Sequence, residues 1–148
     1  MSEPPCPFCT IDAQRVFYTG EVVIGIWDAD PASAGRALLR PKRHVASWFD
    51  ATAQERAELA EATAVARDAI LKRNARENLP IPDGFNIGVN VGESAGQTVF
   101  HLHVHVIPRY RGDATDPRGG VRHVLSDKPN YLAVIDGAVT GSQALDVE

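Results

Sequence analysis

Three histidines follow one another at every second position, His101, His103 and His105. Side chains alternate along a β-strand, so in a strand these three imidazoles project from one face. The apolar residues that alternate with them, and that would face a core, are Leu102, Val104 and Val106. The outer two α-carbons lie about 13 Å apart at about 3.3 Å per residue, too far for three ligands to share one ion easily. A division of labour is favoured, with one histidine on a metal and the others facing a substrate as nucleophile or general acid/base.

The chain has two cysteines, Cys6 and Cys9, in a C-x-x-C arrangement. A structural disulfide is disfavoured in a reducing compartment, which leaves a metal site, a redox pair or no role. A redox pair is expected between a strand and a helix, where the helix dipole lowers a thiol pKa. Here prolines surround Cys6 and no helical pattern follows at once. The spacing therefore favours zinc, which requires two further ligands.

The composition of the chain argues against a nucleic-acid-binding protein and against a membrane-spanning protein. The chain has 148 residues with 15 basic and 19 acidic side chains, a net charge of −4. That balance lacks the basic footprint of a nucleic-acid binder, and no apolar run is long enough to span a membrane. The first residues lack the charged and apolar regions of a secretory signal, so we expect a cytoplasmic protein. Walker A, G-x-G-x-x-G and G-x-S-x-G motifs are absent from the sequence.

The strand signals are short. Residues 15–27 form two β-branched or aromatic runs broken at Gly20, a pattern typical of a hairpin. Turn chemistry over 28–35 then leads to a short strand at 37–40. Further strands are expected at 85–91, at 98–107, where Pro108 would end the strand, and at 131–135. The segment 111–120 reads as a loop, and 141–148 as a loose tail.

One long helix is expected from Thr52 to about Arg73. Thr52 and Glu55 form a capping box. The small and aliphatic residues at helical spacing are Leu59, Ala62, Ala66, Ala69 and Ile70. One long helix, a short helix and about five strands indicate an α+β fold, an antiparallel sheet covered on one side.

The segment GQTVFHLHVHVIPRYRGD (96–113) resembles the signature of the histidine triad (HIT) family of nucleotide hydrolases and transferases. Further segments at fitting distances are CPFC (6–9), RPKRH (40–44) and GFNIGVNVGESAG (84–96). The resemblance implies a single HIT domain over 1–148, with a core at about 6–112 and a C-terminal extension at 113–148. The PRYRGD continuation is similar to the fragile-histidine-triad and dinucleoside polyphosphate hydrolase branch, in the zinc-containing bacterial form.

The resemblance assigns catalytic roles to two histidines. His103 matches the histidine that attacks the α-phosphate and carries a nucleotidyl intermediate. His105 matches a histidine that contacts the phosphate. The polar residues that match positions around the phosphates are Asn90, Gln97 and Thr98. Backbone amides of the loop from Gly92 to Gly96 would add donors.

The nucleoside contacts are also implied by the resemblance. Asp28 falls where the family places a group that hydrogen-bonds the ribose hydroxyls. Phe8, Ile26 and Leu38 match the walls of a base pocket. A purine nucleotide with an AMP moiety is thus the expected partner, with no nucleic acid and no membrane.

Family members with the N-terminal C-x-x-C bind zinc through both cysteines, the histidine of P-K-x-H and the first triad histidine. The matching ligands here are Cys6, Cys9, His44 and His101. A Cys2His2 set leaves no open position, so the zinc is expected to be structural. The family is dimeric through a sheet continued across two chains, so a homodimer is implied.

The leading interpretation is a hydrolase or transferase that cleaves dinucleoside polyphosphates at the α-phosphate through a nucleotidyl-histidine. The alternatives are a nucleoside phosphoramidate hydrolase, a non-catalytic purine-nucleotide-binding protein, and a metalloenzyme that uses the triad directly. One position departs from the family pattern: in AGRALLRPKRH, Arg36 stands where a further histidine is usual. A fixed positive charge there would favour highly charged substrates over singly charged phosphoramidates.

Overall fold

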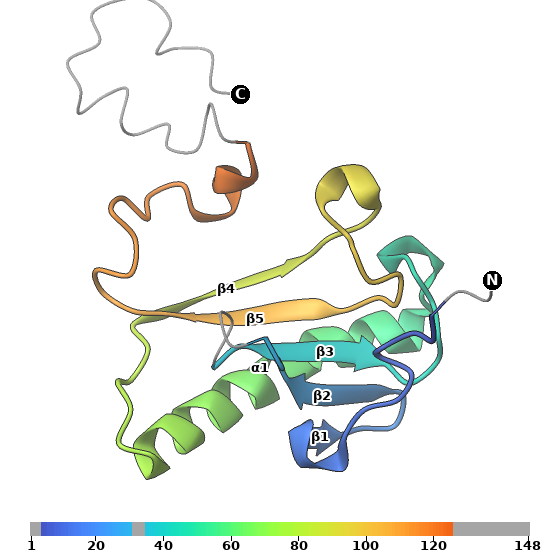
Figure 1. Ribbon diagram of the computed structural model, residues 1–148, viewed down its shortest axis with the longest axis horizontal. Helices are drawn as coiled ribbons and strands as arrows, with labels where there is room; N and C mark the ends of the chain where they lie inside the picture. Colours follow the sequence, from blue (N-terminus) through green and yellow to red (C-terminus); the bar gives the residue numbers. More distant parts are fainter. Residues whose placement is uncertain (1–3, 31–34, 126–148) are drawn as a thin grey trace, which may run out of the picture. The chain divides into compact units, whose positions relative to one another are not determined.

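The computed structural model describes residues 4–30 and 35–125. The chain forms two compact units, Met1–Arg111 and Gly112–Glu148, and the first contains the sheet and the long helix (Figure 1). Among the described residues, no helix is both long and apolar enough to cross a bilayer.

The sheet has five strands in the order β1-β2-β3-β5-β4, and every neighbouring pair is antiparallel. The strands are β1 (Val16–Thr19), β2 (Val23–Trp27), β3 (Ala37–Pro41), β4 (Gly84–Val89) and β5 (Val104–Arg109). The expected hairpin is confirmed, since β1 pairs with β2 after a tight connection in which the Gly20 amide donates to the Val23 carbonyl at 2.8 Å. The α+β fold with an antiparallel sheet is confirmed as well.

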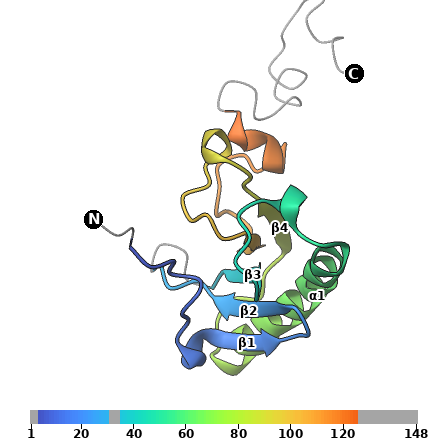
Figure 2. The same ribbon diagram turned by 90° about the vertical axis from the view of Figure 1, so that its right-hand side faces the viewer.

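The helix α1 (Ala53–Arg76) covers one face of the sheet, and the N-terminal segment lies on the other (Figure 2). It begins as predicted: Thr52 Oγ1 accepts from the Glu55 amide at 3.0 Å, and a Glu55 carboxylate oxygen accepts from the Thr52 amide at 2.8 Å. Its small and aliphatic stripe packs against alternate strand residues. The fully buried members of this core are Val23, Ala37, Leu39, Leu59, Ala62, Ala66, Ile70, Leu102 and Val106. Because this core occupies the face of the sheet under α1, a functional site on the sheet must lie on the opposite face.

The prediction of a strand over 98–107 was wrong at both ends. Strand β5 begins at Val104, because residues 98–103 are held by the segment before α1 instead of by a sheet neighbour: the Leu102 amide donates to the Val45 carbonyl at 2.7 Å. The strand also continues through Pro108 to Arg109. β3 pairs with β5 only as far as Val106, so the missing N–H of Pro108 falls where β5 has a single neighbour.

Several expectations concern other parts of the chain. The strand at 131–135, the tail at 141–148 and part of the turn at 28–35 lie outside the described residues. The short helices are single 3-10 turns, among them Ala13–Arg15, Trp48–Asp50 and Glu93–Ala95. In the second unit, turns from residue 112 lead into another such turn at Gly120–Val124, which the sequence patterns did not indicate.

Candidate functional site

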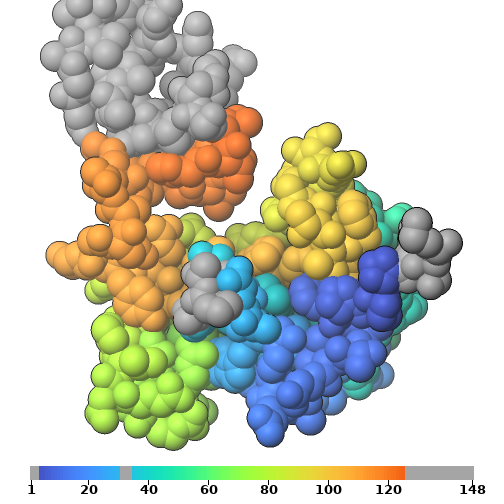
Figure 3. All heavy atoms as spheres, in the orientation of Figure 1, coloured from blue at the N-terminus to red at the C-terminus, as the bar shows by residue number. Residues whose placement is uncertain are grey.

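The sheet face opposite α1 carries a row of residues aligned by strand register. Ile26 pairs with Leu38, Leu38 pairs with His105, and His105 pairs with Gly88. Ile26 and Leu38 are buried although they lie outside the core beneath α1. Figure 3 shows the N-terminal segment, in blue, against the face that is turned to the viewer. The row thus joins an apolar floor to a histidine.

His103 lies beside this row and is 9% exposed. Its Nδ1 lies 2.8 Å from the backbone carbonyl oxygen of His101. A carbonyl only accepts, so Nδ1 carries a proton, and in the neutral ring the lone pair is on Nε2. The ring also meets the edges of two neighbours, Phe8 and His105, each with centroids 4.9 Å away. His103 is therefore held in one orientation, with Nε2 as the ring nitrogen that lies outside this hydrogen bond.

His105 is half-buried, and its Nε2 is buried with no hydrogen-bond partner among the described residues. Burial lowers the pKa of His105, and positive charge on His103 and on Arg36 lowers it further, while the Asp28 carboxylate raises it. An unpaired buried donor or acceptor is costly unless something outside the chain satisfies it. This nitrogen is a ready contact for a bound ligand.

The other triad histidine belongs to a separate cluster. Ligand atoms of Cys6, Cys9, His44 and His101 all lie within 4.8 Å of one another. Cys9 Sγ lies 3.1 Å from His44 Nδ1 and 3.6 Å from His101 Nδ1, and Cys6 Sγ lies 3.7 Å from His101 Nδ1. A tetrahedral zinc ion with bonds of about 2.0–2.3 Å spaces sulfur and nitrogen ligands about 3.5 Å apart. The cluster therefore fits a Cys2His2 metal site.

The orientation of His101 suits that cluster. His101 is fully buried, and its Nε2 lies 2.9 Å from the Pro41 carbonyl oxygen. Nε2 thus carries the proton, and Nδ1 presents its lone pair to the cysteines. Burial lowers the pKa of His101 and keeps it neutral, as a metal ligand must be. Arg40 donates to the same Pro41 carbonyl at 2.8 Å. Arg40 is only 5% exposed, and no sequence pattern indicated that this charged residue would be buried.

The loop from Gly92 to Gly96 is fastened by Gln97. Its Oε1 accepts from the Gly92 amide at 2.9 Å, and its Nε2 donates to the Ala46 carbonyl at 2.9 Å and to the Val99 carbonyl at 3.1 Å. The side chain is 4% exposed. Gln97 therefore shapes the loop through its side chain, a role that its predicted place among phosphate contacts did not include. Gly96 supports a left-handed turn with φ of 90°, which favours glycine.

The remaining predicted residues divide into two groups. Asn90 is half-buried with its Nδ2 beside Gly96, and Thr98 is exposed at the end of the same loop. Asp28 is half-buried at the end of β2, and its Oδ1 accepts from the Asp30 amide at 3.1 Å. Phe8 reaches the site from the N-terminal segment, with its ring edge on His103. Asn90 thus lies beside the loop from Gly92 to Gly96, and the Asp28 carboxylate is near enough to raise the pKa of His105.

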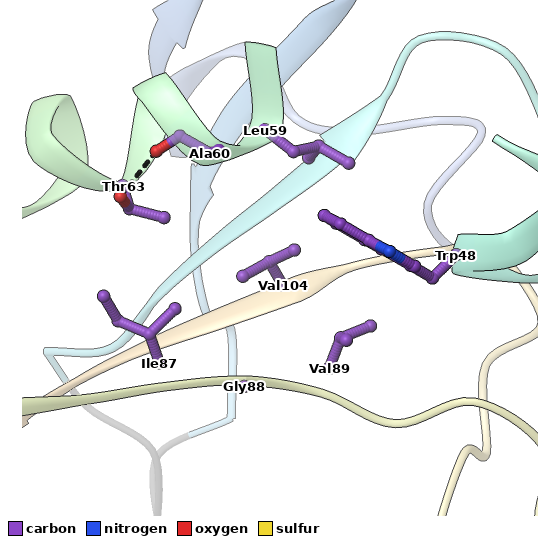
Figure 4. A pocket seen from close by; sticks show the side chains of 8 residues that line it. All are labelled: Trp48, Leu59, Ala60, Thr63, Ile87, Gly88, Val89 and Val104. Atoms are coloured by element: carbon purple, nitrogen blue, oxygen red, sulfur yellow. Dashed lines mark hydrogen bonds between the residues drawn. The ribbon is translucent and has the colours of Figure 1, made fainter. Parts of the chain in front are cut away.

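A pocket of about 330 Å³ lies away from the histidines, on the α1 side of the sheet (Figure 4). Trp48, Leu59, Val89 and Val104 direct apolar side chains into it, and Ile87 on β4 completes it at the edge of the sheet. The pocket offers few polar groups. Its chemistry suits the packing of another surface better than it suits a phosphorylated ligand.

Comparison with known proteins decides the family. The HIT domain model matches residues 10–112. The chain belongs to the HIT family. Among HIT proteins, it is 40% identical to the AP-4-A phosphorylase of Mycobacterium tuberculosis strain H37Rv, over 97% of this chain and 66% of that protein. It therefore spans just under two thirds of that relative. It is also 37% identical to Protein hit of Bacillus subtilis strain 168, over 90% of this chain and 91% of that protein.

Solved HIT structures share the fold. A HIT family protein from Bacillus anthracis is 31% identical, with a TM-score of 0.61 over 94% of this chain and 100% of that chain. A Zn-bound histidine triad family protein from Mycobacterium smegmatis is 34% identical, with a TM-score of 0.54 over 84% of this chain and 87% of that chain. The expectation of a HIT fold is thus confirmed.

Proposed function

We propose that this HIT protein is a nucleotidyl transferase that cleaves dinucleoside polyphosphates of the diadenosine tetraphosphate type at the α-phosphate. The observation that carries the proposal is the hydrogen bond from His103 Nδ1 to the His101 carbonyl. It fixes the tautomer that leaves Nε2 as a nucleophile, beside a histidine with an unsatisfied buried nitrogen. A neutral imidazole held in this way is suited to covalent catalysis near pH 7.

In the first step the His103 Nε2 lone pair forms a bond to the α-phosphorus of the substrate. The bond from that phosphorus to its bridging oxygen breaks, and a nucleoside triphosphate leaves with the electron pair. In the second step an acceptor oxygen attacks the same phosphorus and restores His103. Water gives AMP, and inorganic phosphate gives ADP. The name of the mycobacterial relative, a phosphorylase, makes phosphate an acceptor that must be tested.

The proposal assigns binding roles to the residues that the family resemblance indicates. His105 Nε2 is placed to contact a phosphate oxygen, and backbone amides of the loop that Gln97 fastens supply further donors. Asn90 and Thr98 lie on the phosphate side, and Asp28 takes the ribose hydroxyls. The base rests on the apolar surface of Ile26 and Leu38, with Phe8 as the lid of the same pocket.

We also propose that the cluster of Cys6, Cys9, His44 and His101 holds structural zinc. The distances suit tetrahedral coordination, and a set of four protein ligands leaves no open position for substrate. When bound, zinc supplies folding energy by fastening the N-terminal segment, including Phe8, to the histidine segment. As a zinc ligand, His101 would take no part in the reaction at the phosphate.

A homodimer is the proposed assembly. β4 is the last strand in the sheet order, and Ile87 on it is 49% exposed beside the apolar pocket of Figure 4. An exposed apolar strand edge invites pairing with another strand. A second copy that pairs along β4 would extend the sheet and cover this pocket.

The test is product analysis with diadenosine tetraphosphate, with and without inorganic phosphate. AMP and ATP indicate hydrolysis, and ADP and ATP indicate phosphorolysis. An AMP phosphoramidate run in parallel tests the phosphoramidase alternative. Nucleotide binding without any turnover would favour the non-catalytic alternative and would contradict the proposal. Activity that depends on metal while the protein stays folded without it would instead favour a metalloenzyme.

A further inference from the structure

The C-terminal turn of α1 carries two polar residues, Arg73 and Asn74, that point into the fold. Asn74 is 1% exposed, and its Nδ2 donates to the Pro80 carbonyl at 2.8 Å and to the Tyr110 hydroxyl at 2.9 Å. Its Oδ1 accepts from Arg73 Nη2 at 3.3 Å. Both ends of the Asn74 amide are thus used, and one of them orients the Arg73 guanidinium.

Arg73 touches both ends of the connection between β2 and β3. Its guanidinium carbon lies 4.0 Å from the centroid of the Trp27 ring, in cation–π geometry. The same Nη2 donates to the Gly35 carbonyl at 3.2 Å. Gly35 has φ of 90°, and a Cβ there would lie only 3.2 Å from Nη2. The left-handed backbone therefore favours glycine, and a Cβ there would also press on the Arg73 guanidinium.

The residues that Arg73 holds adjoin two residues of the site. Trp27 directly precedes Asp28, and Gly35 directly precedes Arg36. The Asp28 amide donates to the Arg36 carbonyl at 3.0 Å, so the two positions are joined across the strand ends. Trp27 is also held on its other sides, by the Phe17 ring with centroids 4.5 Å apart and by Arg15, whose Nε donates to the Trp27 carbonyl at 3.0 Å. Arg73 is thus one of the groups that hold the residues before Asp28 and Arg36, and it contacts them from α1 at both strand ends.

We propose that Arg73 is a positioning residue that sets the Asp28 carboxylate for the ribose hydroxyls and so determines the preference for ribonucleotides over 2′-deoxyribonucleotides. The inference rests on the proposed function, in which Asp28 reads the ribose. Arg73 itself does not touch substrate. A hydrogen bond weakens steeply as its atoms move apart. A substitution of Arg73 that displaces the Asp28 carboxylate should therefore weaken its hydrogen bonds to the ribose.

The test compares Arg73→Met with the matched control Arg76→Met. Arg76 lies in the same turn, and its side chain is 73% exposed beside Glu77. kcat/KM is measured for diadenosine tetraphosphate and for its 2′-deoxyadenosine counterpart. In Arg73→Met the preference for the ribose substrate should fall roughly tenfold, with little change for the deoxy substrate. Arg76→Met should keep the wild-type ratio.

Further variants separate positioning from folding. Arg73→Lys keeps the charge but loses the planar fork, so it should show a smaller loss of preference even where Arg73→Met folds poorly. Asp28→Ala should remove the preference, and Arg73→Lys or Arg73→Met should then add nothing. Calorimetric affinities for AMP and 2′-deoxy-AMP give the same comparison without turnover.

Two failures have different meanings. A wild-type protein that binds AMP but does not cleave the tetraphosphate contradicts the proposed function, while its ribose preference in binding still tests Arg73. An active wild type with no ribose preference contradicts the inference. So does a folded Arg73 variant whose preference matches that of Arg76→Met.

Discussion

At the scale of single residues, burial on the sheet face lowers the pKa of His105, and its neighbours set the balance. His103 and Arg36 lower it further, and Asp28 opposes them. The folded chain therefore binds a proton at His105 less readily than the unfolded chain, whose histidines titrate near 6.5. The contribution to stability is full above about pH 6.5 and is lost as pH falls toward the folded pKa.

This predicts a specific pH response. In an NMR titration, the His105 ring should stay neutral below pH 6.5, because its pKa is lowered in the folded chain. His105→Gln removes the titrating group, so its free energy of unfolding should fall less than that of wild type between pH 7 and pH 5. A normal or raised pKa for His105 would contradict the account.

Substitutions of Arg36 test whether this residue favours highly charged substrates. Because the Arg36 charge acts on His105, it lies within electrostatic range of bound phosphates. Arg36→Ala and Arg36→His should each lower kcat/KM for diadenosine tetraphosphate more than for a singly charged AMP phosphoramidate, by about tenfold for Arg36→Ala. Equal changes on both substrates would reject a role in selectivity.

At the scale of elements, Glu58 ties α1 to the β1–β2 hairpin. Its carboxylate accepts from the Val22 amide at 2.9 Å and from the Tyr18 hydroxyl at 3.2 Å, directly over Gly20. A hydrogen bond from a backbone amide to a carboxylate in a half-buried position is worth more than an exposed one. Hairpin and helix therefore depend on a glycine in the connection.

Gly20→Ala should break this contact, because the new Cβ would overlap the Glu58 carboxylate and crowd the Tyr18 hydroxyl. We expect a loss of about 1–3 kcal/mol in the free energy of unfolding, measured by urea denaturation. Gly84→Ala is the matched control, since nothing lies within 4 Å of its Cβ and its φ is ordinary. Equal stabilities for the two variants would show that Glu58 does not act through this contact.

The helices and strands could be predicted from the sequence where a cap or a repeating pattern of apolar residues lies within one short segment. The capping box at Thr52 and the alternation of Leu102, Val104 and Val106 with the histidines were visible because period and cap are local. The start of β5 was not visible, because Val45 and Ala46, distant in sequence, hold Leu102 and Gln97 and so keep residues 98–103 outside the ladder. The prediction that Pro108 ends the strand was wrong, because Pro108 lies beyond Val106, the last residue of β5 that pairs with β3.

The site was predictable to a different degree. The family resemblance assigned the roles of the site residues. Which ring nitrogen of His101 and His103 faces a backbone carbonyl is known only from the folded structure. The fastening role of Gln97 and the reach of Arg73 to Gly35 also depend on folded distances. No sequence pattern states such distances.

At the scale of the whole molecule, the Cys2His2 cluster brings together three segments, and it joins the N-terminal segment to the two segments that flank the paired strands β3 and β5. Cys6 and Cys9 belong to the N-terminal segment, His44 follows β3, and His101 precedes β5. Metal that binds only the folded chain adds its binding free energy to stability. Loss of the metal should therefore loosen the N-terminal segment that carries Phe8.

Purified protein should contain about one zinc ion per chain. Cys6→Ser and His44→Ala should release it and lower Tm, at about 2–4 °C for each kcal/mol lost in a domain of this size. Ser47→Ala is a control, since Ser47 caps the nearby 3-10 turn and belongs to no cluster. Metal analysis of unchelated protein that finds no zinc would refute the assignment.

The central claim is that His103 Nε2 forms a covalent nucleotidyl intermediate, and one measurement addresses it directly. Wild-type protein is mixed with diadenosine tetraphosphate, quenched within a turnover and analysed by intact and peptide mass spectrometry. The account predicts one adenylyl group on His103, and none in His103→Ala, which should stay folded because the side chain lies outside the core beneath α1. An adduct at another residue, or turnover retained by His103→Ala, would contradict the account.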